Sequence, residues 1–141
     1  MRFMMLMIPK VYSGPVDPTF TPPVEAVERM MKYNEELAKA GVLLALDGLH
    51  PPAAGARVRY KGGKPSVQDG PFAESKEMVG GYWLIQVKSR DEAIEWARRI
   101  PADEGDIVEV RQVQDISDWP EETRAAADSP TVRNAIGGTH R

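Results

Sequence analysis

The residue types best suited to acid–base chemistry in this chain are one histidine and two aspartates. His50 is the only histidine in the well-patterned part of the sequence, because His140 stands next to the last residue. A neutral imidazole exchanges protons near pH 7, and a neighbouring carboxylate fixes its tautomer. We predict His50 as a general acid/base, with Asp69 as its orienter or as a second acid/base and Asp47 as an alternative partner. The competing interpretation is a surface histidine in the proline-rich loop His50-Pro51-Pro52.

The stretch DGPFAESKE, residues 69–77, has the composition of a binding loop. Asp-Gly-Pro is typical of a turn in which Gly70 takes a positive φ. Phe72 is the apolar residue of a polar stretch, and we expect it to plug the core. Loops on a rigid scaffold often carry sites. We therefore predict a ligand-binding set of Asp69, Gly70, Pro71, Phe72, Glu74 and Lys76. The alternative is a structural loop with solvated charges.

Basic side chains alternate with apolar ones from residue 56 to residue 61. Arg57, Arg59 and Lys61 therefore share one face of a strand, which could bind an acidic partner or an anionic substrate, or simply face solvent. The sequence has no Gly-rich phosphate loop, no Ser/His/Asp series and no metal-ligand cluster. We expect chemistry without a cofactor and without a metal.

Composition excludes several function classes. The 141 residues contain 18 Lys and Arg against 21 Asp and Glu, so the net charge of −3 argues against binding nucleic acid through its phosphates. The absence of cysteine excludes disulfides and thiolate nucleophiles. The apolar run from Phe3 to Ile8 is too short for a signal peptide or a membrane span. We expect a cytoplasmic protein with no membrane partner.

The hydrophobic periodicity indicates the elements that must position these residues. Helical spacing predicts a helix over 22–40, with Gly41 as its left-handed cap, and a second helix follows the capping box Ser89-x-x-Glu92 and stops at Pro101. Gly62-Gly63 predicts a hairpin turn. The predicted strands cover 3–8, 42–46, 56–61, 65–68, 82–88 and 108–111.

Two βαβ halves joined by a hairpin predict an α+β, ferredoxin-like protomer, with an antiparallel sheet and both helices on one face. This domain covers residues 1–116. Residues 117–141 are expected to add a short helix, over 119–128, and a loose polar tail from 129.

Two central strands of this sheet are apolar on both faces. The first strand carries Phe3, Met5 and Met7 on one side and Met4, Leu6 and Ile8 on the other, and the strand over 82–88 has the same property. The second face then needs a cover, and the simplest cover is a second copy in a two-fold homodimer. The alternative is a monomer in which the C-terminal segment, with Trp119, folds back over that face.

The stretch 69–77 closely resembles the signature of the YCII-related proteins known for the DGPF motif. That signature is often written DGPFAETKE, and this chain differs from it only at Ser75. Leu-His-Pro at 49–51 and Val-Glu-Val-Arg at 108–111 are similar to the family as well. The resemblance covers roughly residues 1–113.

The resemblance implies the dimeric α+β barrel superfamily. Relatives in that superfamily act on small ring compounds between sheet and helices, some through a His and Asp pair. It therefore implies a cofactor-independent enzyme or binder of an aromatic or anionic small molecule. Some relatives are encoded beside, or fused to, extracytoplasmic-function sigma factors, which implies the alternative of a non-enzymatic, dimeric regulatory or interaction protein.

Overall fold

The computed structural model describes residues 1–72 and 77–136. Its main sheet has the strand order β2-β5-β1-β6, and every neighbouring pair is antiparallel. This is the ferredoxin-like α+β fold that the sequence predicts. The elements that build it are β1 (Arg2–Ile8), α1 (Val24–Lys39), β2 (Leu43–Gly48), β5 (Gly81–Gln86), α2 (Arg90–Arg98) and β6 (Ile107–Gln112).

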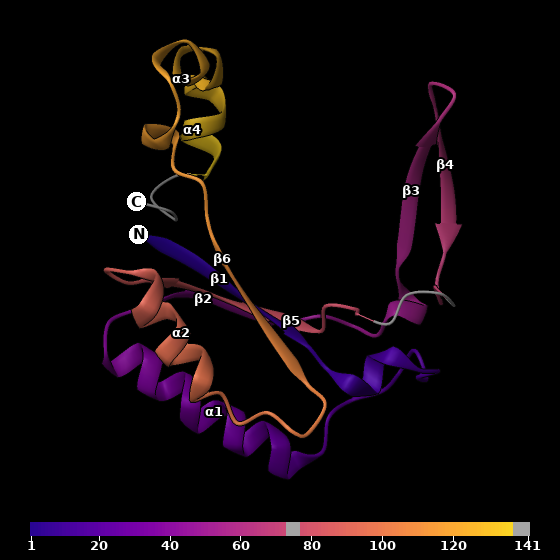
Figure 1. Ribbon diagram of the computed structural model, residues 1–141. Helices are drawn as coiled ribbons and strands as arrows, with labels where there is room; N and C mark the ends of the chain where they lie inside the picture. Colours follow the sequence, from indigo (N-terminus) through magenta and orange to yellow (C-terminus); the bar gives the residue numbers. More distant parts are fainter. Residues whose placement is uncertain (73–76, 137–141) are drawn as a thin grey trace.

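Both helices cover the same face of this sheet (Figure 1). Strand alternation sends Phe3 and Met5 of β1, and Trp83 and Ile85 of β5, toward the helices, where they are buried. Leu37 of α1 is fully buried against them. The apolar stripe of α1 and the inner rows of the sheet therefore make one continuous core.

Local signals place the helix ends close to the expected residues. Ser89 Oγ accepts a hydrogen bond from the Glu92 amide at 3.1 Å, as the capping box predicts. The Glu92 carboxylate, however, accepts from the amide of Lys88 and not from that of Ser89. Gly41 has a φ of +74°, so the predicted left-handed residue after α1 is confirmed.

A buried aromatic cluster ties the two helices to the sheet. Trp83 Nε1 donates to Asn34 Oδ1 at 2.7 Å, and the Tyr33 hydroxyl donates to the Trp96 carbonyl at 2.7 Å. The Tyr33 ring meets Trp83 and Trp96 edge to face, with centroids 5.9 and 6.4 Å apart. The polar atoms buried by this packing are thus hydrogen-bonded, as a dry core requires.

No helix within residues 1–72 and 77–136 covers the other face of the sheet (Figure 1). The strand register shows which side chains are neighbours on this face: Leu84 of β5 lies beside Met4 of β1, and Tyr82 lies beside Leu6. Glu109 and Arg111 of β6 continue these rows at one edge, with 3.8 Å between carboxylate and guanidinium. We call this surface, apolar in the centre and polar at the edge, the open face.

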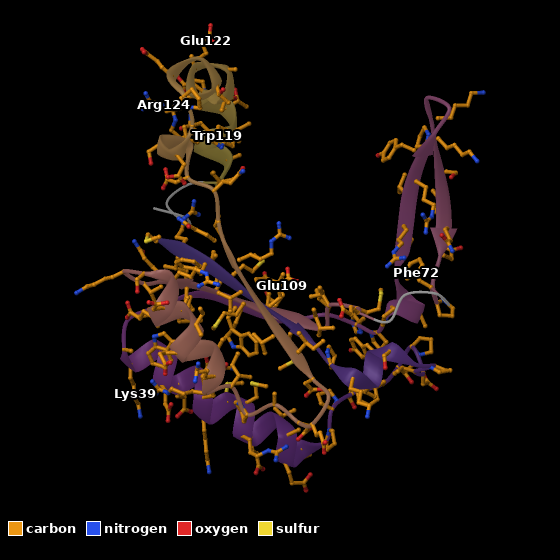
Figure 2. The ribbon with its side chains drawn as sticks, in the orientation of Figure 1. Lys39, Phe72, Glu109, Trp119, Glu122 and Arg124 are labelled. Atoms are coloured by element: carbon orange, nitrogen blue, oxygen red, sulfur yellow. The ribbon has the colours of Figure 1, made fainter. Side chains whose placement is uncertain are left out.

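Two segments project from the side of the open face (Figure 1). One is the hairpin of β3 (Ala56–Lys61) and β4 (Lys64–Asp69), whose turn glycines Gly62 and Gly63 both have positive φ. The other, which we call the C-terminal arm, spans 115–136 and holds the short helices α3 (Glu121–Ala127) and α4 (Pro130–Ile136). Trp119 lies on this arm, which rises away from the sheet (Figure 2).

The arm differs from its sequence prediction. Residues from 129 were expected to form a loose polar tail, but residues 130–136 form α4. Ser129 Oγ accepts a hydrogen bond from the Val132 amide at 3.2 Å, and Pro130 occupies the first helical position. Ser129-Pro130 therefore starts a helix here. The polar composition of the segment predicted a tail instead.

Among the described residues, no helix is long and apolar enough to cross a membrane. Within the same residues, no group of three His, Cys, Asp or Glu side chains could hold a metal ion.

Burial raises the pKa of Tyr33 well above the ordinary value of 10.0. Above pH 10 the unfolded chain loses a proton that the folded chain keeps, so stability falls as pH rises. We predict that Tyr33→Phe loses about 1 kcal/mol at neutral pH, through the missing hydrogen bond, and unfolds with a shallower pH dependence above pH 10.

Urea unfolding at neutral pH and at several pH values above 10 measures both effects. Tyr60→Phe is the matched control, because Tyr60 is 80% exposed. Equal alkaline slopes for Tyr33→Phe and the unsubstituted chain would contradict this origin of the pH dependence.

Candidate functional site

A pocket of about 260 Å³ lies at the base of the hairpin. Three segments far apart in sequence form it: η1 (Lys10–Ser13) with the loop after it, η2 (Pro52–Ala54), and Pro71 and Phe72 of the DGPF stretch with Met78 just after that stretch. Its walls are largely apolar and include Tyr12, Val16, Pro52, Pro71, Phe72 and Met78. A concave apolar surface with a few polar groups is the usual form of a small-molecule site.

Gly70 holds two of these segments together. Its amide donates to the Gly55 carbonyl at 2.9 Å, and a Cβ at this position would lie only 2.0 Å from the Pro52 carbonyl oxygen. Gly70 does not adopt the positive φ that glycine allows in such a turn, since it is not among the left-handed glycines. Glycine is needed because two backbones approach closely, which leaves no room for a side chain.

Phe72 is buried, as expected, but it belongs to the pocket wall and not to the main core. The guanidinium of Arg57 lies over its ring, 4.1 Å from the centroid. Arg57 also donates to Met78 Sδ at 3.3 Å. A basic side chain of β3 thus contacts two side chains of the pocket wall. Figure 2 shows Phe72 at the base of the hairpin.

The loops that carry the predicted acid–base pair flank this pocket. His50 lies two residues before Pro52, and Asp69 two residues before Pro71. Both side chains are exposed, and among the described residues no hydrogen bond or ion pair joins them. The Gly70 contact brings the backbones of their two loops together. The pairing of the His50 and Asp69 side chains stays a prediction.

Two further contacts concern the surroundings of His50. The Tyr12 hydroxyl donates to the Leu49 carbonyl at 3.1 Å, which anchors the residue before His50 to the pocket wall. Asp47, the alternative partner of His50, instead accepts a hydrogen bond from the Tyr82 hydroxyl at 3.1 Å on the open face. That hydrogen bond, with the negative charge of Asp47, raises the pKa of Tyr82.

Glu74 and Lys76, two members of the predicted ligand-binding set, lie outside the described residues. Of the other four, Pro71 and Phe72 line the pocket, Gly70 lies against the backbone of the wall residue Pro52, and Asp69 is exposed at the end of β4. The predicted basic stripe is confirmed as one face of the hairpin.

Sequence reasoning missed Tyr12, Pro52 and Met78 as wall residues. Tyr12 stands alone among prolines and glycines, without periodicity to mark it as buried. The pairing of a Pro-Pro segment with an Asp-Gly-Pro segment is a contact between two loops, and neither strand nor helix spacing indicates it.

Comparison with known proteins identifies relatives of this chain. The family model of the YCII-related domain matches residues 1–117. An uncharacterised protein of Rhizobium meliloti (strain 1021) is 40% identical over 78 residues, which span 52% of this chain and 63% of that protein. The chain therefore covers less than two thirds of the length of this relative.

The close approach at Gly70 generates a stability prediction. We expect Gly70→Ala to destabilise the fold by about 1–3 kcal/mol, because the new methyl group must displace the Pro52 backbone. Gly55→Ala is a matched control, since its Cβ would lie 3.5 Å from the same carbonyl oxygen, at ordinary contact distance. Urea unfolding measures the difference, and equal stability of the two variants would contradict the proposed role of the contact.

Proposed function

The chain belongs to the family of YCII-related domains, and we propose that it binds a small aromatic anion in the pocket at the base of the hairpin. The observation that carries this proposal is the pocket itself, because the family motif supplies two of its walls through Pro71 and Phe72. A structural turn alone would not need an aromatic side chain beside an apolar hollow.

The wall chemistry favours an aromatic ligand. Tyr12 and Phe72 offer ring surfaces, and Met78 offers a polarisable thioether that packs well against rings. Prolines supply much of the remaining wall, so the pocket is rigid and needs little ordering when a ligand binds.

The charge near the pocket favours an anion. Arg57 contacts Phe72 and Met78, which places its guanidinium beside the pocket. A guanidinium pairs well with a carboxylate because its donors match the carboxylate oxygens in geometry. A ring with an attached carboxylate would set its ring against the apolar walls and its negative charge near the basic face of the hairpin.

We propose His50 and Asp69 as the acid–base pair of a cofactor-independent reaction on such a ligand. Their loops meet through the contact between Gly70 and the Pro52 backbone, and both side chains are exposed. His50 would move a proton to or from the ligand, and Asp69 would fix its tautomer. A ligand-bound crystal structure with the two groups farther apart than one bridging water would remove the pair.

The open face supports a homodimer. Met4 and Leu6, both partly exposed, lie at its apolar centre beside the buried Leu84, while Glu109 and Arg111 form a polar edge. This is the usual anatomy of an interface, an apolar centre within a polar rim. We propose that two copies pack these faces together. The cytoplasmic location stays a prediction from the sequence.

The regulatory alternative predicts a different result for small-molecule binding at the pocket. A sigma-factor-linked interaction protein would use its surface and would not need the pocket to bind small molecules. Failure of every aromatic anion at the pocket, together with a stable dimer, would favour that alternative.

Benzoate, which has both a ring and a carboxylate, is a suitable first probe. We predict that it shifts the amide NMR signals of Ser13, Gly14 and Phe72 in ¹⁵N-labelled protein. Ala53→Phe fills the pocket and should weaken binding by about tenfold or more. Ala54→Phe, on the exposed next residue of η2, should leave binding unchanged. Equal binding by both variants would place benzoate elsewhere and contradict the proposed site.

Substitution on the open face tests the dimer. We predict a mass of twice 15.6 kDa for the chain in sedimentation equilibrium, and a monomer for Leu6→Asp, because a buried pair of carboxylates is costly. Val27→Asp, at an exposed position of α1, should stay dimeric. Circular dichroism checks that each variant folds. A mass of 15.6 kDa for the unsubstituted chain at micromolar concentration would rule out the dimer.

A further inference from the structure

The β3–β4 hairpin has an apolar face that is left exposed. Val58 pairs with Val67, and Tyr60 pairs with Pro65, so these four side chains share one face of the ribbon. Tyr60 is 80% exposed and Val67 is 71% exposed. A two-stranded ribbon is marginally stable by itself in water, and an apolar face of this kind marks a contact surface.

The C-terminal arm has a complementary shape. A hollow of about 610 Å³ lies between its helices, and Ile116, Val132 and Ile136, each about half exposed, are among the side chains that line it. None of the predicted site residues lines this hollow. The arm therefore offers a concave apolar surface, and the hairpin offers an exposed apolar ridge.

The charges of the two segments are opposite. The hairpin, residues 56–69, has four basic side chains and one acidic, a net charge of +3. The arm, residues 115–136, has five acidic and two basic side chains, a net charge of −3. Such segments attract one another when they belong to different copies and repel their own kind.

Two-fold symmetry allows two arrangements of these segments in a dimer packed through the open faces. Both project from the same side of the sheet, at opposite ends (Figure 1). If the axis runs along the line that joins them, each hairpin lies beside the partner's hairpin. If the axis runs across that line, each hairpin lies beside the partner's arm. The charges favour the second arrangement, because the first juxtaposes two segments of net +3.

We propose that in the homodimer the hairpin of each copy docks against the C-terminal arm of its partner, with the Tyr60 face seated on the hollow lined by Ile116, Val132 and Ile136. This inference rests on the proposed dimer and specifies its geometry. It also connects the dimer to the ligand site, because the docked hairpin carries Arg57 and Asp69 at its base, beside the pocket. The partner then holds in place the strands that complete the site.

The chain has no cysteine, so single cysteines introduced by substitution can be cross-linked without background. Tyr60→Cys and Val132→Cys are made separately in the full chain, mixed, allowed to exchange subunits and treated with a short bis-maleimide linker. We expect a covalent dimer in the mixture and little in either variant alone. Lys39→Cys, on the helical side of the molecule (Figure 2), is the control and should not cross-link with Tyr60→Cys.

The outcomes separate this inference from the dimer itself. Cross-linking of Tyr60→Cys alone, or no cross-linking in a mixture that sedimentation shows to be dimeric, would overturn the docking of hairpin on arm and leave the open-face dimer standing. A monomeric chain would contradict both.

Charge exchange provides a second measurement. Lys61→Glu with Lys64→Glu on the hairpin, and Glu121→Lys with Glu122→Lys on the arm, should each raise the dissociation constant of the dimer by about tenfold or more. The chain with all four substitutions should recover its affinity, which local unfolding of either segment could not produce. Lys32→Glu with Lys39→Glu on α1 changes the net charge equally and should have little effect. Absence of recovery would count against the docking.

Discussion

The contact between Gly70 and the Pro52 backbone is the constraint on which the site depends. Without a side chain at residue 70, the loop after β4 lies directly against η2, and the Gly70 amide hydrogen-bonds to Gly55. This contact anchors the base of the hairpin, holds the wall residues Pro52 and Pro71 near one another, and brings the loops of His50 and Asp69 together. The DGPF stretch, the clearest motif in the sequence, therefore joins two loops through Gly70, and the pocket lies beside this junction.

The sheet imposes the second constraint. β1 and β5 are apolar on both faces, and the two helices cover only one (Figure 1). On the covered side, the Asn34–Trp83 and Tyr33–Trp96 hydrogen bonds give partners to the polar atoms that the packing buries. The open side has the apolar centre and charged edge of an interface, and the hairpin and the arm stand at its two ends. We propose that a second copy covers these surfaces together.

The strands and helices of the main domain could be predicted from the sequence, because each has a periodic apolar stripe and a local start or stop signal. Ser89 and Gly41 are examples in which the chemistry of one residue determined the boundary. The pocket could not be predicted in this way. Its walls come from Tyr12, Pro52 and Met78, which lie on irregular loops and meet through a backbone contact. Likewise α4 begins at Ser129-Pro130 in a segment whose composition is that of a tail.

We propose that the DGPF stretch builds a pocket for a small aromatic anion, and contacts between the ligand and the pocket wall test this proposal most directly. Nuclear Overhauser effects between the ring protons of bound benzoate and the side chains of Phe72 and Met78 report those contacts in solution. We predict cross-peaks to the Met78 methyl group and to the Phe72 ring, and their loss in Ala53→Phe. Cross-peaks confined to the open face or to the C-terminal arm, or none at saturating benzoate, would contradict the account.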